Sequence, residues 1–428
     1  MPSLGGFRRS GAALVALGVI GGLSAGPAYA DDPKGTARWS PMVVSASAEC
    51  AVPSKDVEGV PWSLQRVLLN QLWLPDSTLP KEKQKPIDGD GILVAVIDTG
   101  VDNKNPQLAD KVVDGGAFIK KDGQEDTGPA TADQVGHGTK VAGIIAAGKS
   151  DKTGFIGLAP KAQILAIRQN DAQGSGDVPH LIDAINRAIQ MKAKVINISQ
   201  DVRGTGADGD FDHKPELEKV LKDAEKARIV VVASSGNDGL EGNTYPAAFP
   251  TVLAVGASDR NNERASFSQY GTFVDVVAPG VDMLSTARSY GQCVDNGTSF
   301  SAPYVAGVAA LLKQKYPDWT PAQIRARIEQ TAERSGRDRN DYTGWGVVDP
   351  VKAVQSNAEP EDEPKPEAAV QLDSARIVAQ PLGLAETQQD RDSRTALYVL
   401  GGGLLTVAGL GGASVVMRDR RKARGEGS

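Results

Sequence analysis

Short apolar runs alternate with amphipathic stretches through the middle of this chain. Residues 92–97 (ILVAVI) form an unbroken apolar run of strand length. Similar runs lie at 164–167, 195–198, 229–232 and 252–255, and helical apolar spacing lies at 139–147, 181–191, 217–227, 300–316 and 324–331. Because strands that are buried on both faces read as continuous apolar runs, this alternation predicts an α/β fold, a doubly wound parallel sheet flanked by helices.

The chain of 428 residues is long enough for one large domain with appendages. The alternating pattern places that domain at residues 91–354. Residues 355–394 contain an acidic, proline-bearing run (EPEDEPK, 359–365) and few large apolar residues after it. A segment of this composition buries too little apolar surface to fold, so it is predicted to be an extended linker.

The amino-terminal residues have the layout of a targeting segment. Arg8 and Arg9 precede the apolar stretch 12–23, and Ala28-Tyr29-Ala30 has the small-x-small form of a signal peptidase site. This pattern predicts a signal peptide at 1–30 and general secretion, with an uncleaved anchor as the alternative.

Residues 31–90 then form an extension before the domain. It has an apolar face that is expected to pack on the core rather than plug the site, made of Trp62, Leu64, Val67, Leu68, Leu72 and Trp73.

The carboxyl-terminal residues predict a membrane helix. Residues 395–417 carry no charge and are long enough to cross a bilayer, and the tail 418–428 begins with a cluster of arginine and lysine. The positive-inside rule places that tail in the cytoplasm and the large domain outside, on a single-pass anchor. A buried globular helix and a disordered glycine-rich tail remain the alternatives.

Charge and ligand patterns exclude some functions. The net charge of −6 gives no broad attraction to nucleic acid. The acidic loop 204–212 lacks the glycine and the closing glutamate of an EF-hand, so a solvated loop is predicted in place of a calcium site. No metal or other cofactor is predicted.

Three polar residues stand where the elements begin or end. Asp98 follows the run 92–97, His137 lies between two glycines before a predicted helix, and Ser299 opens the helix predicted at 300–316, whose first turn would hold Pro303. A serine nucleophile needs a base, and that base needs a third group to orient it. The chain order Asp, His, Ser therefore predicts a catalytic triad for acyl transfer.

A fourth segment supplies a donor for the oxyanion. The stretch 233–239 (ASSGNDG) follows the apolar run 229–232 and contains Asn237. Its side-chain amide and the Ser299 N–H predict an oxyanion hole, with an ordinary turn asparagine as the alternative.

These four segments resemble those of the subtilisin-like serine proteases (subtilases, peptidase family S8), and the resemblance spans residues 92–350. The run 61–73 (PWSLQRVLLNQLW), the cysteine-bearing extension and the carboxyl-terminal helix resemble more narrowly the mycosins, the membrane-anchored subtilases associated with type VII secretion in actinobacteria. The resemblance implies a subtilisin-like fold, serine endopeptidase activity and a protein or peptide substrate.

The resemblance also implies where substrate binds. Many subtilases continue with Ser-Leu-Gly after the strand at 195–198, where this chain has Ser199-Gln200-Asp201. The substrate-binding residues predicted on this basis are Ser199, Gln200, Ser234, Ser235 and Gly236. The bulkier polar residues are expected to alter the primary specificity pocket and to narrow the substrate range.

The two cysteines, Cys50 and Cys293, would lie in an oxidising compartment. A disulfide between them would hold the extension against the nucleophile side of the core and contribute about 4–5 kcal/mol, and two free buried thiols are the alternative. The wrapped extension of the mycosins implies the same pairing.

The sequence as a whole predicts an extracytoplasmic serine endopeptidase anchored in the cell membrane. Its resemblance to the mycosins implies a role in type VII protein secretion, with the secretion membrane complex as a partner. Two alternatives remain, a structural subunit that stabilises such a complex and a general cell-surface protease.

Overall fold

The computed structural model describes residues 42–43, 50–121, 124–125, 128–203, 209–359, 361–368 and 386–425. The predicted signal peptide, 1–30, lies outside these residues, as do most of 31–49 and part of the predicted linker. The chain divides into two compact units, Met1–Ala368 and Ala369–Ser428.

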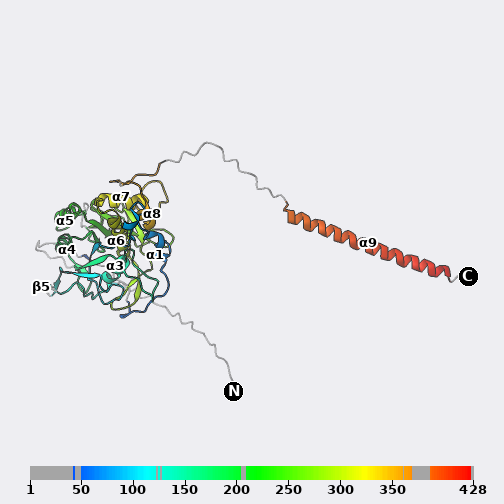
Figure 1. Cartoon of the computed structure of the whole chain (residues 1–428), viewed down its shortest axis with the longest axis horizontal. Coiled ribbons are helices and arrows are strands. Elements are labelled where there is room, and N and C mark those ends of the chain that lie inside the picture. Colours follow the sequence, from blue (N-terminus) through cyan, green and yellow to red (C-terminus); the bar gives the residue numbers. More distant parts are fainter. Residues whose placement is uncertain are drawn as a thin grey trace, which may run out of the picture. The chain divides into compact units, whose positions relative to one another are not determined.

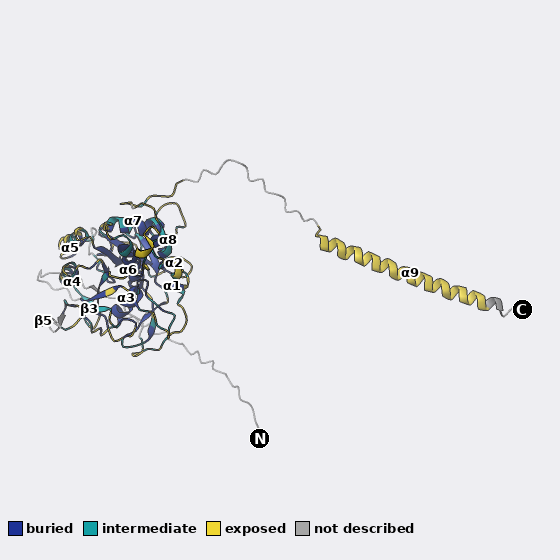
Figure 2. Cartoon of the chain, viewed as in Figure 1, coloured by how far each residue is buried: buried dark blue, intermediate teal, exposed yellow. Residues whose placement is uncertain are grey.

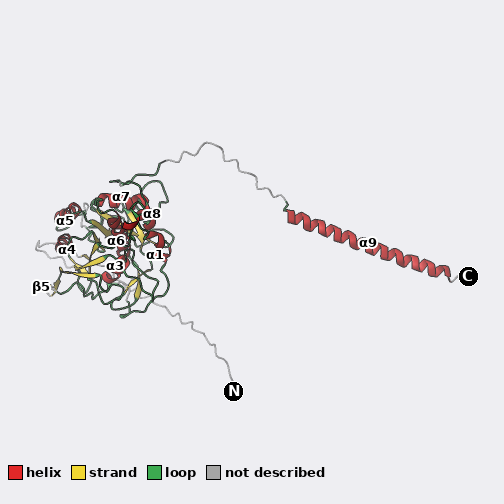
Figure 3. Cartoon of the chain, in the orientation of Figure 1, coloured by secondary structure: helices red, strands yellow, loops and turns green. Residues whose placement is uncertain are grey.

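A seven-stranded parallel sheet is the centre of the first unit among the described residues (Figure 3). Its strand order is β11-β10-β9-β8-β2-β6-β3. The strands are β2 (Leu93–Asp98), β3 (Val112–Ala117), β6 (Gln163–Arg168), β8 (Val195–Ile198), β9 (Val230–Ser234), β10 (Val252–Ser258) and β11 (Val276–Pro279). The predicted α/β class is confirmed.

Helices cover both faces of this sheet, and they surround it in Figure 1. Helices α3 and α6 pack on the face that buries Val94 and Val96, whereas α4 and α5 pack on the face that buries Ala95 and Ile97. The helices of this unit are α1 (Trp62–Gln65), α2 (Leu69–Leu72), α3 (His137–Ala146), α4 (Val178–Gln190), α5 (Lys214–Lys226), α6 (Thr298–Lys315), α7 (Pro321–Thr331), α8 (Pro350–Gln355) and the 3-10 helix η1 (Lys81–Lys83). Alternate residues of a strand point to opposite faces, so each run supplies both hydrophobic cores.

The five apolar runs correspond to β2, β6, β8, β9 and β10, which are the five strands between the two edge strands. The sequence reading missed the two edge strands. In β3 a bulge lies between Asp114 and Ala117, and Gly115 and Gly116 within it read as a turn. The pattern also missed short antiparallel pairs, β12 (Met283–Thr286) with β13 (Gln292–Asp295), β4 (Lys120–Lys121) with β5 (Gln124–Glu125), and β1 (Met42–Val43) with β7 (Ser175–Gly176).

The extension packs on the core through most of the apolar face named above. Leu64, Val67 and Leu72 are buried in the cluster that covers the α3–α6 face of the sheet. The indole N–H groups of Trp62 and Trp73 donate to the carbonyls of Val281 and Leu158, each at 2.9 Å. Leu68 is the exception, because its side chain is 52% exposed.

A disulfide joins Cys50 of the extension to Cys293 of β13, with the two Cα atoms 6.1 Å apart. Hydrogen bonds continue the attachment along the hairpin of β12 and β13. The Ser54 N–H donates to the Tyr290 carbonyl at 3.1 Å, and the Tyr290 hydroxyl donates to the Asp56 carboxylate at 2.6 Å. The extension is therefore fixed to the strand that leads into Ser299.

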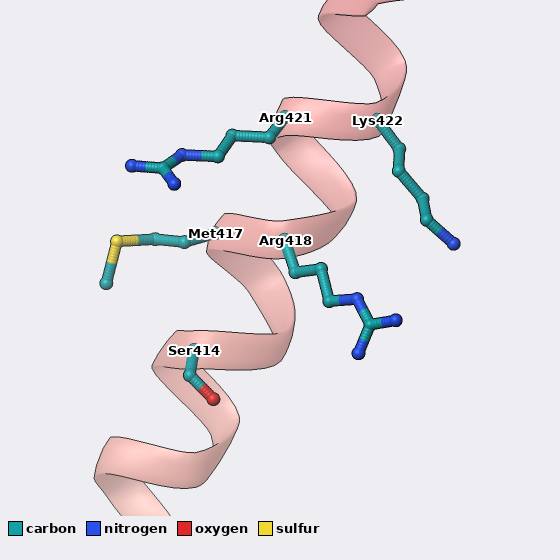
Figure 4. A pocket seen from close by; sticks show the side chains of 5 residues that line it. All are labelled: Ser414, Met417, Arg418, Arg421 and Lys422. Carbon is teal, nitrogen blue, oxygen red and sulfur yellow. The ribbon is translucent and has the colours of Figure 1, made fainter.

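The described part of the second unit, residues 386–425, consists almost entirely of one long helix, α9 (Gln388–Gly425). It begins earlier than the predicted membrane helix 395–417, so residues 388–394 of the predicted linker are helical. The hydroxyl of Thr387 accepts the Asp390 N–H at 3.2 Å, which is an N-cap that the linker prediction overlooked. Among the described residues α9 is the one helix long and apolar enough to span a membrane, and the side chains of its residues 388–422 are exposed within this unit (Figure 2). Figure 4 shows Arg418, Arg421 and Lys422 extending from its last turns.

A buried carboxylate in α7 makes the stability of the first unit depend on pH. Burial raises the pKa of Glu329 to about 8, and the nearby Asp275 carboxylate adds to this shift, whereas Arg325 and Arg339 oppose it. The folded state therefore holds the proton more tightly than the unfolded state, whose glutamate has a pKa near 4.5. This stabilisation is complete below that value and is lost as the pH rises through about 8.

Glu329→Gln is accordingly expected to flatten the loss of stability between pH 5 and pH 8.5. Wild type should lose about 4 kcal/mol of unfolding free energy over this range, and the Glu329→Gln variant should lose much less. Urea unfolding of the full chain at several pH values measures the difference. An exposed control, Glu333→Gln, should leave the wild-type slope unchanged, and equal slopes in wild type and Glu329→Gln would contradict the assignment.

Candidate active site

Asp98 and His137 form a buried pair at the carboxyl end of the sheet. Asp98 is the last residue of β2, and His137 is the first residue of α3. The His137 Nδ1 atom lies 2.8 Å and 2.9 Å from the two carboxylate oxygens of Asp98, and both side chains are at most 1% exposed. Among the described residues the other ring nitrogen, Nε2, is buried with no hydrogen-bond partner.

Asp133, which the sequence reading missed, fixes the position of the helix that carries His137. Its carboxylate accepts the N–H of Gly136 at 2.7 Å, the N–H and hydroxyl of Thr139 at 2.9 and 2.6 Å, and the hydroxyl of Thr99 at 2.8 Å. Burial raises the pKa of Asp133, and these hydrogen bonds oppose the shift. An aspartate a few residues before a predicted helix was the available signal, since such residues cap helix starts.

Ser299 is the second residue of α6, which begins at Thr298 rather than at residue 300. Pro303 therefore lies beyond the first turn, contrary to the prediction. Proline has no N–H, so the Ser299 carbonyl lacks its usual partner four residues ahead. The Ser199 hydroxyl donates to that carbonyl at 2.9 Å, and the Ser299 hydroxyl donates to the Ser199 carbonyl at 3.2 Å.

Asn237 lies against the start of the same helix. Its side-chain oxygen accepts the Thr298 N–H at 2.8 Å and the Thr298 hydroxyl at 3.0 Å. These bonds fix the orientation of the amide, whose nitrogen is a hydrogen-bond donor. The Ser299 N–H belongs to the first turn, whose amides the helix itself does not use. Thus the two predicted oxyanion donors flank one helix start.

The predicted substrate-binding residues lie on the segments after β8 and at the end of β9. Gly236 has a φ of +100°, a conformation suited to glycine, and its N–H donates to the Thr298 hydroxyl at 3.2 Å. Ser235 donates to the Gln269 carbonyl at 3.3 Å, and the Gln200 amide contacts the side chain of Gln169. Ser234 is buried, and its hydroxyl has no partner among the described residues.

Asp201 belongs to the first of these segments and approaches the second at Gly236. Its carboxylate oxygen would be 3.4 Å from a Cβ atom built on Gly236. Burial raises the pKa of Asp201 to about 6, with Arg203 opposing this shift and Asp238 adding to it. This residue stands where many subtilases have glycine, so this chain has a carboxylate beside Gly236 of the other segment that is predicted to hold substrate.

In the part of the chain that the structure describes, no group of three or more His, Cys, Asp or Glu side chains is arranged to hold a metal ion. Residues 204–208 of the acidic loop lie outside that part.

Comparison with known proteins identifies the family. The sequence profile described as "Subtilase family" matches residues 89–346, more than half of the chain. The chain belongs to the subtilase family. This subtilase is 38% identical to Subtilisin Savinase of Lederbergia lenta over 298 residues. This alignment covers 70% of the chain and 100% of that relative. It is also 40% identical to Subtilisin E of Bacillus subtilis over 271 residues. This alignment covers 62% of the chain and 66% of that relative.

Solved structures of mycosins are similar to this subtilase as well. The MycP3 protease from the type VII (ESX-3) secretion system matches with a TM-score of 0.62 and 31% identity, covering 76% of this chain and 96% of that one. MycP1 from Mycobacterium smegmatis matches with a TM-score of 0.62 and 27% identity. This match covers 78% of this chain and 94% of that one. The protein is thus a subtilisin-type serine endopeptidase whose structural neighbours include mycosins.

Proposed function

We propose that Asp98, His137 and Ser299 are the catalytic triad of this endopeptidase. The observation that carries the proposal is the buried contact between the His137 imidazole and the Asp98 carboxylate, whose closest atoms are 2.8 Å apart. A carboxylate at Nδ1 holds the imidazole in the tautomer that leaves Nε2 as the base. Nε2 then takes the proton of the Ser299 hydroxyl as this oxygen attacks the scissile carbonyl, and later gives it to the leaving amine.

The hydroxyl of Ser299 has to turn before this step. It donates to the Ser199 carbonyl at 3.2 Å, so attack requires rotation about one side-chain bond toward His137. Catalytic hydrogen bonds are often long or misdirected without substrate and tighten when substrate binds. The second bond between these residues, from the Ser199 hydroxyl to the Ser299 carbonyl, keeps the backbone in place during that rotation.

Asn237 and the Ser299 N–H are proposed to stabilise the oxyanion. The Thr298 bonds hold the Asn237 amide before substrate arrives, so no reorganisation is needed when charge develops. The start of α6 adds the partial positive charge of a helix amino terminus.

Substrate is proposed to bind as an added strand beside residues 199–201, with its primary side chain between that segment and residues 234–236. The carboxylate of Asp201, which approaches Gly236, supports a restricted substrate range. Ser199 is proposed to act here through its main chain, because its hydroxyl is bonded to Ser299.

Anchoring and a role in secretion extend the proposal beyond peptidase activity. The length and composition of α9, together with the basic residues after it, support a single-pass membrane anchor with an outward-facing catalytic unit and a cytoplasmic tail. The similarity to MycP3 supports a function with a type VII secretion membrane complex. A structural role in such a complex is the second candidate. Secretion restored by a Ser299→Ala chain in a deletion strain would favour it.

A fluorophosphonate probe tests the catalytic proposal directly. The full chain in detergent, with its disulfide intact, is expected to be labelled at Ser299, because the reagent needs an activated serine and an accessible oxyanion site. The Ser299→Ala chain is the control. Absence of labelling in a folded wild-type chain would contradict the proposed triad in this state of the protein.

A further inference from the structure

A buried ion pair joins the two segments that carry His137 and Ser299. Lys140 of α3 and Asp295 at the end of β13 are in contact, with Nζ and Oδ2 2.6 Å apart. Their side chains are 3% and 4% exposed. Lys140 is one turn after His137 on the same helix face, and Asp295 precedes Ser299 by one short loop.

Phe300 links this ion pair to the imidazole. Its ring centroid is 5.2 Å from that of His137 and 6.0 Å from the Lys140 Nζ atom. Phe300 also follows Ser299 directly in α6. The ammonium group, the aromatic ring and the imidazole are therefore successive neighbours beneath the proposed catalytic atoms.

The hairpin that carries Asp295 is attached closely to α3. The Ser285 hydroxyl of β12 donates to the Lys140 carbonyl at 2.6 Å, and the Thr286 hydroxyl donates to the Thr139 carbonyl at 2.8 Å. A Cβ atom on Gly143 would come within 2.5 Å of both hydroxyls. This close approach leaves one arrangement of helix and hairpin in which the ion pair can form.

The energetics of buried charges indicate a role other than stability. Removing a lysine and an aspartate from water costs free energy that their attraction often fails to recover, and apolar replacements of similar volume are frequently as stable. In some proteins a buried ion pair instead selects one relative position of the two segments that it joins.

We propose that Lys140 and Asp295 are positioning residues, which hold the helix of His137 and the segment of Ser299 in the register that the reaction needs. This inference rests on the proposed triad. A displacement of about 1 Å between reacting groups lowers turnover by up to about a hundredfold, because the aligned geometry is lost.

Single and paired variants of the full chain test the proposal. Lys140→Met and Asp295→Leu are each expected to lower kcat about tenfold or more with little change in KM, since the substrate segments are untouched. The double variant Lys140→Met/Asp295→Leu removes both buried charges together and should keep the wild-type melting temperature. Its kcat should nevertheless stay as low as that of the single variants.

A second ion pair provides the matched control. Arg325 and Glu225 are in contact at 2.9 Å between α7 and α5, away from the triad. Arg325→Met/Glu225→Leu should keep the wild-type kcat.

A folded Lys140→Met/Asp295→Leu chain with wild-type kcat would overturn the positioning role. Failure of the proposed triad is a separate result, because in that case wild type itself would show neither turnover nor labelling. If only the single variants fail to fold, the double variant still decides the outcome.

Discussion

Replacing Ser299 with alanine is expected to lower turnover of a peptide substrate about a millionfold, with little change in KM. This is the order of loss found when a triad serine is removed from a serine protease, because nothing else forms the acyl intermediate. The remaining activity should come from the oxyanion donors and substrate positioning alone. Steady-state kinetics of the full chain, with peptides selected by the wild-type protein, measures the ratio.

A neighbouring serine is the matched control for this substitution. Ser301 lies two residues further along α6, and its buried hydroxyl has no partner among the described residues. Ser301→Ala should therefore retain wild-type turnover. Comparable activity of Ser299→Ala and wild type would remove Ser299 from the triad.

Replacing Asn237 with alanine is expected to lower kcat by about a hundredfold to a thousandfold, because one donor to the oxyanion is lost. Asn237 also holds Thr298, so the alanine variant alone would not separate these roles. Asn237→Asp keeps an oxygen that can accept from Thr298 but loses the amide donor. Measurement of kcat for both variants distinguishes donation from positioning.

The expected pattern is a large loss in both Asn237 variants, with melting temperatures near that of wild type for Asn237→Asp. Near-normal kcat in Asn237→Asp together with a large loss in Asn237→Ala would show that the residue acts only by holding Thr298. Unchanged kcat in both would exclude it from the reaction.

The sequence patterns predicted the strands in the middle of the sheet but not its two edge strands. The run 92–97 and its four counterparts are buried on both faces of the sheet, so each is apolar throughout and easy to recognise. Strand β3 lies at an edge, is partly exposed, and contains two glycines at a bulge. Such a strand has neither the composition nor the alternation that identifies strands in sequence.

Some residues of the candidate site could likewise be predicted from the sequence, and others could not. The motifs around Asp98, His137 and Ser299 were readable because each lies where one element meets a turn, and the residues next to it carry the signal. The roles of Asp133 and Lys140 could not be predicted in this way, because an aspartate or a lysine near a helix start is usually exposed. Their burial depends on segments that approach them from elsewhere in the chain.

The family, the central strands and the three residues proposed for catalysis can be recognised in the amino-acid sequence alone. They can be recognised because apolar runs and glycine-flanked polar residues are patterns of adjacent positions. Two other contacts become visible in the folded chain: Ser199 bonds to the backbone of Ser299, and Asp295 lies against Lys140. Those contacts join residues 100 and 155 positions apart, and they exist only after the sheet and its helices bring separate segments together.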